Sequence, residues 1–449
     1  MTELFGTDGI RGVANRYPVT PEIALRLGKA VGHVMGSQEK PSRRVLIGKD
    51  TRLSGYMLET ALTSGLVSSG MDVLLVGPLP TPGVAHLTRT MNAAVGIMLT
   101  ASHNEFDDNG IKLFDSKGFK LRDEIEEKLE DAILSSSFSS DHIRSDKLGK
   151  ARRIEDARGR YIEFAKNSIG SHTLDGLKLV LDCANGAAYR IGPWIFEELG
   201  AEVIELHTDP DGFNINEDCG ALYPGTVGKA VLEHNADVGI AFDGDADRVI
   251  FCDENGKLID GDRVLGMCAL HYKAGNRLLQ DTFVVTSMSN LGLLDAMHEH
   301  GIKTETTDVG DRYVIDRMRK GGFNLGGEKS GHLIFMDYAT TGDGIISALQ
   351  VLRLMQEKNT PISELADCMT EYPQKLVSVR VAERKPIDEI LPLTEAIQNC
   401  QAELNGVGRV VVRYSGTEPK IRFLVEAKDK KLVDKWIAEL TRIAEKELA

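Results

Sequence analysis

The chain has 449 residues, and its 53 basic and 67 acidic side chains give a formal net charge of −14 at pH 7. This length predicts about three domains, and a hydrophobic fraction of 42% is enough for large cores, which excludes a wholly disordered protein. The acidic balance argues against a protein that coats nucleic acid or binds anionic membranes, because both functions need basic surfaces. No apolar run approaches the ~20 residues needed to span a bilayer.

The N-terminal sequence and the cysteines indicate a cytoplasmic location. The opening MTELFGTDGIRG has acidic residues and glycines where a signal peptide has a basic start and an apolar run. The six cysteines are widely scattered and none forms a Cys-x-x-Cys pair, so free thiols in a reducing compartment are expected rather than a disulfide framework.

The first third of the chain alternates short apolar runs with amphipathic segments, which predicts an α/β layer with a mainly parallel sheet. The polar segment Ser135–Arg152 has little pattern, and we expect a loop or a helix end there, near the first domain boundary. The expected strands are Val45–Lys49, Met71–Val76 and Ala94–Leu99, and the expected helices are Pro21–Met35 and Met57–Ser69.

The same strand-helix rhythm restarts twice, although no repeat is visible as residue identity. The second unit is expected to contain the strands Lys178–Asp182, Ala201–Leu206, Ala236–Phe242 and Val249–Cys252. The last of these leads into Asn255-Gly256, a pair typical of a hairpin turn. The third unit is expected to contain the strands Thr282–Ser287, Lys303–Thr307 and Asn324–Gly326.

The C-terminal segment has a different pattern. Lys375–Val381, Arg409–Tyr414 and Ile421–Ala427 alternate like strands, and a helix is expected at Lys430–Leu448. Three α/β units followed by a smaller α+β domain is therefore the predicted architecture.

Ser102 lies in the segment Thr100–Asn104, directly after an expected strand, where α/β sheets usually bind ligands. An acyl nucleophile is one interpretation, but the G-x-S-x-G pattern is absent. A phosphoryl carrier is another, with His103 and Lys112 supplying charge or proton transfer. The alternative without chemistry is a helix N-cap serine followed by polar loop residues.

Asp243, Asp245 and Asp247 also follow an expected strand, at alternate positions. Three carboxylates can converge on one hard cation, Mg²⁺ or Ca²⁺. An EF-hand is the main rival, but Arg248 stands where that loop requires glycine, and the flanking segments are expected to be strands. A strand-loop Mg²⁺ site is favoured over a solvated acidic turn, because close carboxylates repel each other without a cation.

The segment Gly326–His332 offers Glu328, Ser330 and His332 on a glycine-rich backbone, a combination that suits a polyhydroxylated ligand. It lacks the spacing of a phosphate-binding P-loop, and a plain glycine-rich turn is an equal alternative.

The segment Arg413–Arg422 places two arginines on either side of a Ser-Gly-Thr turn, which could hold a phosphate. A hairpin with a solvated basic edge is the alternative. Two further loops also carry cations: Phe5–Gly12 contains Arg11, and Gly48–Arg52 contains two cations. Either loop could be an ordinary surface loop, but the position of such loops after strands favours a cleft shared with the segments above.

Taken together, these segments resemble the α-D-phosphohexomutase superfamily from Phe5 to the C-terminal helix. The motifs FGTDGIRG, TASHN, DGDADR, GEKSGH and RYSGTEPKIR occur in the superfamily's order. The opening FGTDGIRGVAN, together with DCANGAAY, DVGDRYV, TTGDG and SGTEPKIR, resembles the branch that acts on glucosamine phosphates.

The resemblance implies three similar α/β domains and a C-terminal α+β domain around a central cleft. The expected boundaries are 1–153 with the phosphoserine loop, 154–256 with the metal loop, 257–369 with the sugar-binding loop, and 370–449 for the phosphate-binding domain.

The resemblance also implies roles for individual residues. Ser102 works as a phosphoserine, and together with Asp243, Asp245 and Asp247 it holds one Mg²⁺ per chain. Residues at the reaction centre are Arg11, His103, Lys112 and Arg248. Residues that bind the substrate are Glu328, Ser330, His332, Arg413, Ser415, Gly416, Thr417 and Arg422.

The implied activity interconverts glucosamine 6-phosphate and glucosamine 1-phosphate through a phosphoserine enzyme and a 1,6-bisphosphate, which serves as intermediate and primer. The product feeds UDP-N-acetylglucosamine synthesis. The expected partner is a small phosphosugar, without nucleic acid or membrane, and a homodimer is an open option. A phosphoglucomutase or phosphomannomutase with the same chemistry is one alternative, and a metal- or sugar-phosphate-binding protein without activity is another.

Overall fold

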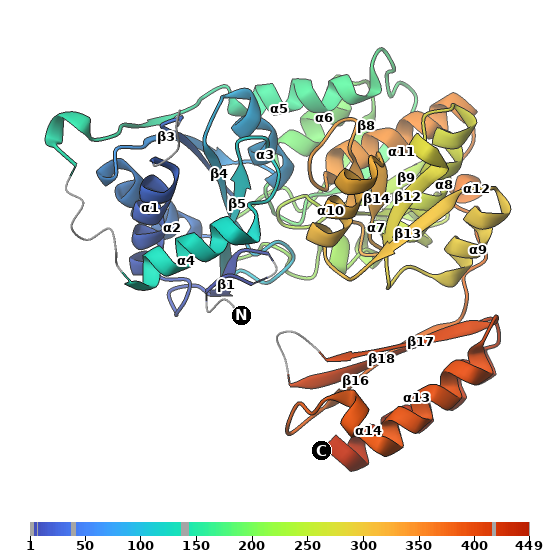
Figure 1. The fold of residues 1–449 in the computed structure, drawn as a ribbon. Helices are drawn as coiled ribbons and strands as arrows, with labels where there is room; N and C mark the ends of the chain where they lie inside the picture. The colour runs from blue at the N-terminus through green and yellow to red at the C-terminus, as the bar shows by residue number, and fades with distance from the viewer. Residues whose placement is uncertain (1–3, 7, 37–41, 136–142, 415–418, 449) are drawn as a thin grey trace.

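The computed structural model describes residues 4–6, 8–36, 42–135, 143–414 and 419–448. Four sheets follow one another along the chain, each with its own helices (Figure 1). We call them unit I (β1–β6), unit II (β7–β11), unit III (β12–β15) and the C-terminal unit (β16–β18). Three α/β units and a smaller α+β unit confirm the predicted fold class.

Unit I is built on a six-stranded sheet with the order β1-β5-β4-β2-β3-β6. Strands β4, β2, β3 and β6 run parallel to one another. At one edge of the sheet, β5 pairs antiparallel with β4, and β1 pairs antiparallel with β5. Its strands are β1 (Ile10–Val13), β2 (Arg44–Lys49), β3 (Asp72–Pro78), β4 (Val95–Leu99), β5 (Asp108–Asp115) and β6 (Ala151–Arg153). Its helices are α1 (Pro21–Gly36), α2 (Ser54–Ser68), α3 (Thr81–Thr90) and α4 (Asp123–Ser135).

Unit II has a five-stranded sheet with the order β11-β10-β9-β7-β8. The predicted Asn-Gly hairpin is present, because β10 and β11 pair antiparallel across it. Its strands are β7 (Lys178–Asp182), β8 (Glu202–Leu206), β9 (Val238–Phe242), β10 (Val249–Cys252) and β11 (Leu258–Ile259). Its helices are α5 (Ala157–Lys166), α6 (Ile191–Glu198) and α7 (Gly225–His234).

Unit III has a four-stranded sheet with the order β13-β12-β14-β15. Its strands are β12 (Thr282–Thr286), β13 (Lys303–Thr307), β14 (Leu325–Gly327) and β15 (Leu333–Phe335). Its helices are α8 (Gly261–Ala274), α9 (Leu291–Glu299), α10 (Asp311–Gly321), α11 (Gly344–Lys358) and α12 (Ile362–Leu365). Single 3-10 turns occur at Ser145–Lys147, Asn167–Ile169, Gly220–Leu222, Leu279–Asp281 and Ile387–Glu389.

The three α/β units repeat one strand order that their sequences do not reveal. In each, the first parallel strand lies between the second and the third, and a fourth strand returns antiparallel beside the third: β3-β2-β4-β5, β8-β7-β9-β10 and β13-β12-β14-β15. The connection from third to fourth strand carries the Ser102 loop in unit I. The same connection carries the three aspartates in unit II and Glu328 in unit III. Three motifs far apart in sequence thus occupy equivalent loops.

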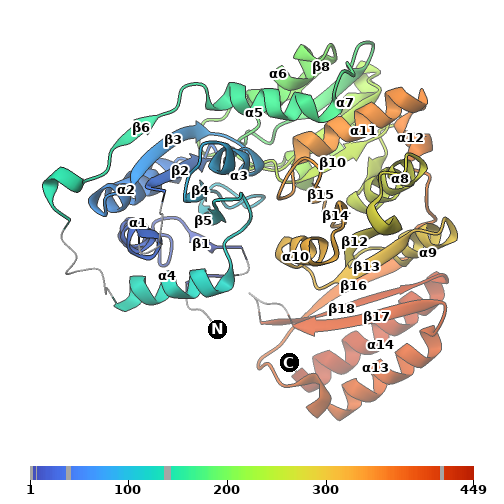
Figure 2. The same cartoon turned by 45° about the horizontal axis from the view of Figure 1, so that its top comes forward.

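The C-terminal unit is a three-stranded antiparallel sheet, β16-β18-β17, covered by two helices on one face. Figures 1 and 2 place these helices on the side of the sheet that faces away from the other units. Its elements are β16 (Gln374–Arg380), α13 (Leu391–Leu404), β17 (Gly408–Tyr414), β18 (Lys420–Ala427) and α14 (Lys430–Leu448).

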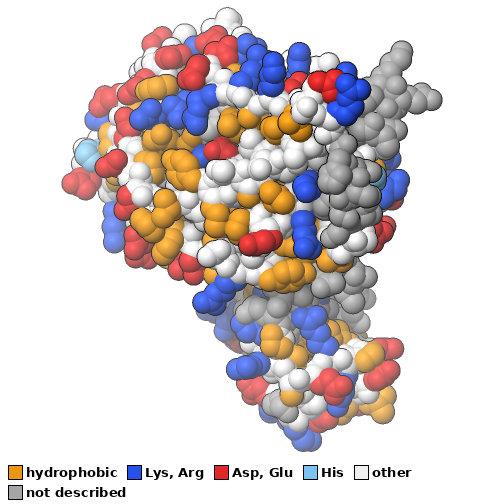
Figure 3. Space-filling view, turned by 90° about the vertical axis from the view of Figure 1, so that its left-hand side faces the viewer, with side chains coloured by type: hydrophobic (Ala, Val, Ile, Leu, Met, Phe, Trp, Pro, Cys, Tyr) orange, Lys and Arg blue, Asp and Glu red, His pale blue; other side chains and the backbone are white. Residues whose placement is uncertain are grey.

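Units I, II and III share a hydrophobic core, whereas the C-terminal unit has a separate one. One continuous cluster joins units I, II and III and includes Met98 of β4, Phe242 of β9 and Phe335 of β15. The C-terminal unit has a core of its own around Phe423 and Trp436. Figure 3 shows this unit as a narrower lobe below the body formed by the other three.

Two elements differ from the sequence prediction. The segment Ser135–Arg152 was expected to be loop or helix end, but Ala151–Arg153 forms β6 and pairs with β3. Its three side chains are exposed, so it carries no apolar pattern. Asp108–Asp115, which is not among the expected strands, forms β5 along β4. No helix in the described ranges is long and apolar enough to cross a membrane.

Candidate active site

Ser102 lies in the loop between β4 and β5, where its side chain meets unit II. It is 1% exposed, and its Oγ donates a hydrogen bond to Asp243 Oδ2 at 2.7 Å. His103 Nδ1 lies 3.2 Å from the same oxygen. Burial, followed by the cations of Arg248 and Arg11, lowers the pKa of His103 to about 4. The loop leads into a strand, so the helix N-cap alternative is wrong.

The three aspartates of the loop between β9 and β10 converge beside Ser102. Asp243, Asp245 and Asp247 are all buried, and each offers a carboxylate oxygen within 4.8 Å of the others. Burial, followed by the charges of Asp247 and Asp245, raises the pKa of Asp243 to about 8. The strands on both sides make the EF-hand alternative wrong, and the burial excludes a solvated acidic turn.

The oxygens of this cluster fit a hard divalent cation. Asp245 Oδ1 and Asp247 Oδ1 are buried without a hydrogen-bond partner, although buried polar atoms are nearly always paired. Carboxylate oxygens are the ligands that Mg²⁺ prefers. The described residues contain a second group that could hold a metal by its spacing, made of Asp182, His207 and Cys219. It differs because the carboxylate oxygens of its aspartate are not free of hydrogen bonds. The two oxygens of Asp182 there already accept the backbone N–H groups of Ala184 and Gly220.

Lys112 of β5 lies among the acidic groups of the site. Its Nζ donates to Asp245 Oδ2 at 2.9 Å and to Asp247 Oδ2 at 3.1 Å, and lies 3.4 Å from Asp8 Oδ2. Burial opposes its charge, but Asp245, Asp247 and Asp8 outweigh burial and raise the pKa of Lys112 well above its ordinary value. Lys112 therefore supplies a fixed positive charge at this point.

Asp8 holds the N-terminal loop to the site. Its carboxylate forms ion pairs with Arg11 and Lys120 as well as with Lys112. Lys120 also pairs with Asp311 of α10 at 2.6 Å, which joins unit I to unit III. Asp8 and Asp311 belong to the motifs FGTDGIRG and DVGDRYV, which predict no role for either carboxylate. Their role was missed because the sequence does not show which cations they meet.

Arg248 and His332 approach the same cluster from two sides. The backbone N–H of Arg248 donates to Asp243 Oδ1 at 3.2 Å, and its Nε lies 3.9 Å from Asp247 Oδ1. His332 Nδ1 lies 3.7 Å from Asp247 Oδ1. His332, predicted with the sugar-binding residues, thus lies against the aspartate cluster. Thr81, at the start of α3, donates to Asp245 Oδ2 at 2.6 Å and was not identified from the sequence.

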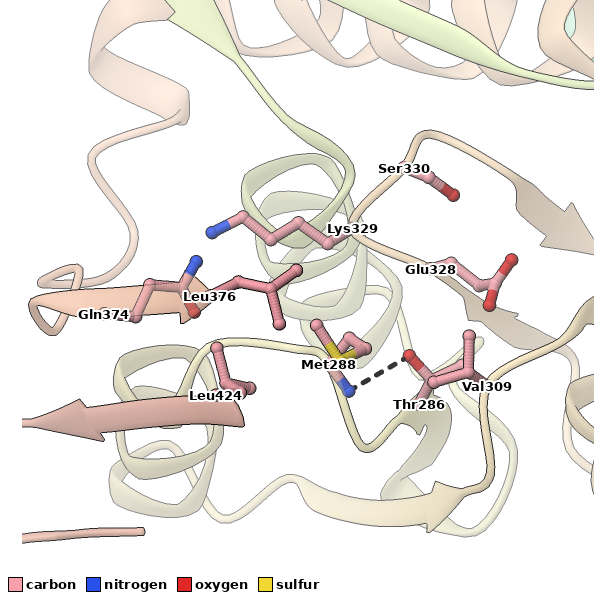
Figure 4. Close-up of a pocket in the computed structure, with 9 residues that line it drawn as sticks. All are labelled: Thr286, Met288, Val309, Glu328, Lys329, Ser330, Gln374, Leu376 and Leu424. Atoms are coloured by element: carbon pink, nitrogen blue, oxygen red, sulfur yellow. Dashed lines mark hydrogen bonds between the residues drawn. The ribbon is translucent and has the colours of Figure 1, made fainter. Parts of the chain in front are cut away.

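The loop with Glu328 opens onto a cavity of about 360 Å³ between unit III and the C-terminal sheet (Figure 4). Glu328 accepts the backbone N–H of Gly310 through Oε1 at 3.1 Å. The lining residues are Thr286, Met288, Val309, Glu328, Lys329, Ser330, Gln374, Leu376 and Leu424. A hydrogen-bonding loop thus faces an open volume of the size of a small ligand.

Arg413 and Arg422 lie opposite each other on β17 and β18. Side chains alternate between the two faces of a strand, and Phe423 and Val425 of β18 pack against the helices. Arg422 and Leu424 therefore lie on the opposite face of β18. Leu424 lines the cavity, so Arg422 lies on the face that borders it. Like charges in opposite positions repel unless an anion lies between them. Burial, followed by Arg422, lowers the pKa of Arg413. Ser415, Gly416 and Thr417 lie outside the described residues.

The two cations of the segment Gly48–Arg52 are buried in ion pairs, so this segment is not an ordinary surface loop, and Arg52 also bonds the backbone of the Ser102 loop. Lys49 Nζ bonds Glu59 Oε2 at 2.7 Å, and both side chains are buried. Arg52 is fully buried and forms an ion pair with Asp50. Both cations are therefore internal to unit I, where neighbouring carboxylates neutralise them.

Comparisons with known proteins show the family to which the chain belongs. Family models of phosphoglucomutase/phosphomannomutase match α/β/α domain I at residues 2–140, domain II at 159–256, domain III at 260–372 and the C-terminal domain at 376–443. The phosphoglucosamine mutase of Pelobacter propionicus is 53% identical over 449 residues, which cover 100% of this chain and 99% of that protein. The chain belongs to the phosphoglucosamine mutase family.

Other members and relatives of the phosphoglucosamine mutase family extend the comparison. The phosphoglucosamine mutase of Bdellovibrio bacteriovorus is 52% identical over 453 residues, covering 100% of this chain and 99% of that protein. A phosphoglucomutase/phosphomannomutase family protein of Burkholderia thailandensis superposes with a TM-score of 0.81 at 24% identity, covering 100% of this chain and 98% of that one. The N-acetylphosphoglucosamine mutase of Aspergillus fumigatus, solved with GlcNAc-6P and magnesium, superposes with a TM-score of 0.68 at 19% sequence identity. The match covers 100% of this chain and 96% of that one.

Membership of the phosphoglucosamine mutase family confirms the resemblance predicted from the motifs. It makes the chain an enzyme of the isomerase class. The binding protein without activity is therefore not supported.

Proposed function

We propose that Ser102 carries the phosphoryl group by which this chain interconverts glucosamine 6-phosphate and glucosamine 1-phosphate. The observation that carries the proposal is the contact of Ser102 Oγ with Asp243 inside a buried cluster of three carboxylates. Two buried oxygens of this cluster, Asp245 Oδ1 and Asp247 Oδ1, lack hydrogen-bond partners, which supports a cation beside the hydroxyl and a phosphate on it. The names of the relatives support the amino sugar as substrate.

The proposed reaction consists of two phosphoryl transfers. In the first, the bond between phosphorus and Ser102 Oγ breaks and Ser102 Oγ takes up a proton, while phosphorus bonds to the free hydroxyl oxygen of the sugar phosphate, which gives up its proton to a base. The product is glucosamine 1,6-bisphosphate. The bisphosphate turns around, and its other phosphoryl group returns to Ser102 Oγ, which gives up its proton. The sugar oxygen left behind takes up a proton, and the monophosphate leaves. Such transfers depend on positioning and charge rather than on covalent chemistry by the protein.

The acidic loop would hold one Mg²⁺ through Asp243, Asp245 and Asp247 together with the phosphate on Ser102. The ion would offset negative charge on the group in transfer. A solved N-acetylphosphoglucosamine mutase that shares the fold contains magnesium, which supports this choice of metal. A phosphoserine adds up to two negative charges beside three carboxylates, so the site also needs the cations of this chain.

The chain's own cations and base complete the reaction centre. Lys112 donates to Asp245 and Asp247, which supports a role in charge compensation. Arg248 and Arg11 add positive charge at the edge of the cluster, where both side chains are partly exposed. The candidate general bases are His103, Lys112 and Arg11. Lys112 and Arg11 form ion pairs with aspartates, whereas His103 lies beside Ser102 Oγ. His103 is therefore the preferred candidate.

Substrate recognition is assigned to the other side of the cavity. Glu328 and Ser330 would bind sugar hydroxyls. Arg413 and Arg422, together with Ser415, Gly416 and Thr417, would bind the phosphate that is not in transfer. The position of Arg413 and Arg422 on the face of the C-terminal sheet that lines the cavity supports this division.

A coupled assay tests the function. Purified protein with glucosamine 6-phosphate, Mg²⁺ and a sugar bisphosphate primer should form glucosamine 1-phosphate, and intact-mass analysis should find phosphate on Ser102. The variant Ser102→Ala should remain folded without turnover. Full activity in that variant would remove the phosphoserine mechanism. Values of kcat/KM for glucosamine, glucose and mannose phosphates, measured side by side, should be highest for glucosamine.

A further inference from the structure

The backbone carbonyls of the Ser102 loop accept hydrogen bonds from two side chains that come from different units. Arg52 of unit I donates through Nη2 to the carbonyl oxygens of Ser102 at 3.3 Å and Glu105 at 3.4 Å, and to that of Asn104. Asn216 of unit II donates through Nδ2 to the same oxygens of Ser102, at 2.9 Å, and Asn104, at 2.8 Å. Neither side chain has a contact with Ser102 Oγ among these bonds.

The guanidinium of Arg52 is fixed before it reaches the loop. It is 0% exposed and forms an ion pair with Asp50 through its other terminal nitrogen. The backbone N–H of Arg52 donates to Asp50 Oδ1 at 3.0 Å, and the N–H of Asp50 donates to the carbonyl of Leu99 at the end of β4. The planar fork of arginine is therefore oriented by the segment that follows β2, and this segment is bonded to the end of β4, the strand that leads into the loop.

Asn216 brings unit II to the same point. It is 4% exposed, has a φ of +59°, and its backbone N–H donates to the carbonyl of Ala184. Gly244 of the aspartate loop packs on the contact: a Cβ there would lie 2.6 Å from the carbonyl oxygen of Ser102 and 2.8 Å from Asn216 Nδ2. The space between the two loops is thus filled by Asn216 and by backbone.

Ser102 needs such support because its backbone is in an unfavourable conformation. Its φ is +53°, the left-handed region that residues other than glycine seldom adopt. Conformations of this kind persist only where surrounding contacts determine them, and they concentrate at active sites. The carbonyls of Ser102 and Asn104 each accept from both Arg52 and Asn216.

We propose that Arg52 and Asn216 are positioning residues that set the direction of Ser102 Oγ toward the acidic cluster by holding the carbonyls of its loop. The inference rests on the proposed role of Ser102 as the phosphoryl carrier. It adds that transfer depends on an amide from unit II and a buried guanidinium, both of which bond carbonyl oxygens of the loop. Because they act on the geometry of the attacking and leaving oxygen, their loss lowers kcat and leaves KM nearly unchanged.

The sharpest test replaces Asn216. Glycine tolerates its positive φ and removes both hydrogen bonds, and aspartate keeps the shape but places an acceptor against two carbonyls. Asn216→Gly is expected to lower kcat about tenfold to a hundredfold, the scale of a small misplacement of reacting groups. Asn216→Asp is expected to lower kcat further. The matched control is Asn235→Gly, at another left-handed asparagine in unit II, which should keep the wild-type kcat.

A second variant, Arg52→Lys, retains a cation beside Asp50 but lacks the second terminal nitrogen that reaches the loop. Its kcat is expected to fall while its melting temperature stays near that of the wild type. The ³¹P resonance of the phosphoserine should shift in the Asn216 and Arg52 variants and not in Asn235→Gly. A purely structural role would change the melting temperature without moving this resonance.

The phosphate content of Ser102 is measured first in every variant, so that poor loading is not mistaken for slow transfer. If Ser102→Ala is inactive while Asn216→Gly and Arg52→Lys keep the wild-type kcat and ³¹P resonance, the positioning role is wrong and the phosphoserine mechanism stands. If Ser102→Ala is active, the carrier itself is wrong. A rise in KM alone in the Asn216 variants also overturns the positioning role.

Discussion

The body formed by units I, II and III differs from the C-terminal unit in how it is held together. The body shares one hydrophobic core, and the groups around Ser102 are buried and linked by hydrogen bonds between units. The C-terminal unit folds around a separate core, and its contacts with unit III include hydrogen bonds from Leu291 to Glu426 and from Arg409 to Ser289. The groups around Ser102 therefore belong to one shared frame, whereas Arg413 and Arg422, which we propose bind phosphate, lie on a unit with a core of its own.

The contact between the two regions is centred on Glu426 of β18. This carboxylate is fully buried, accepts the backbone N–H of Leu291 at 2.8 Å, and bonds Arg409 at 2.9 Å. Arg409 in turn donates to the carbonyl of Ser289. The cavity with Glu328 and Leu424 lies at the same junction. If the division holds, changes in the body should act on kcat, and changes on the C-terminal sheet should act on KM.

The largest effect is expected from the acidic loop. Asp245→Asn removes a charge whose Oδ1 lacks a hydrogen-bond partner, and kcat should fall by about 10³-fold because charge stabilisation at the site is lost. Chelation of divalent ions should stop the wild-type reaction, and added Mg²⁺ should restore it. Asp253→Asn is the control, since Asp253 is also buried but accepts backbone N–H groups in the hairpin after β10. Equal activity losses in both variants would contradict the assignment.

Lys112 offers the next largest effect. Lys112→Met removes the cation between Asp245 and Asp247, so kcat should fall about 10²-fold. Lys49→Met is a matched control, because Lys49 is also a buried lysine of unit I but pairs with Glu59 instead. It should lower the melting temperature and leave kcat near the wild-type value. Steady-state kinetics and thermal melts of both variants decide, and a wild-type kcat in Lys112→Met would be the contrary result.

Arg413→Ala tests the other region. Loss of charge-assisted hydrogen bonds to a phosphate, worth about 1.5–3 kcal/mol, should raise KM by roughly tenfold or more while the melting temperature changes little. Arg442→Ala, on the exposed side of α14, should change neither value. A large loss of thermal stability in Arg413→Ala without a change in KM would instead favour a structural hairpin.

The smallest effect concerns a contact between α5 and the start of α11. Tyr161 donates its hydroxyl to both oxygens of Asp343 at 2.9 Å. Burial raises the pKa of Asp343 to about 7, against hydrogen bonds from Ile346 and Tyr161. The folded state thus keeps a proton that the unfolded chain has released above about pH 4, so this group's contribution to stability falls as the pH rises toward 7.

Tyr161→Phe removes a donor that favours the carboxylate of Asp343. The variant should lose about 1–3 kcal/mol of unfolding free energy, and the loss should grow between pH 6 and pH 8 as the carboxyl ionises. Denaturant unfolding across this range, in the presence of a chelator, measures it, with Tyr189→Phe as control. A loss that is constant with pH would show that the hydrogen bond does not favour the ionised form.

The sequence predicted what local pattern can determine. The buried central strands were located to within about two residues, because strands covered on both faces are continuously apolar. Strand β6 was missed because its side chains are exposed. The Ser102 loop and the aspartates were found because each follows such a strand. Thr81, Asp8 and the inward position of Arg52 were not, because they depend on contacts between segments far apart in the chain.

One experiment tests the central claim most directly. Enzyme labelled with radioactive phosphate on Ser102 is mixed with unlabelled glucosamine 6-phosphate and Mg²⁺ and quenched within a single turnover. The label should leave the protein and appear in the bisphosphate and monophosphate sugars at least as fast as kcat. Label that stays on Ser102 while the sugar phosphates interconvert would contradict the account.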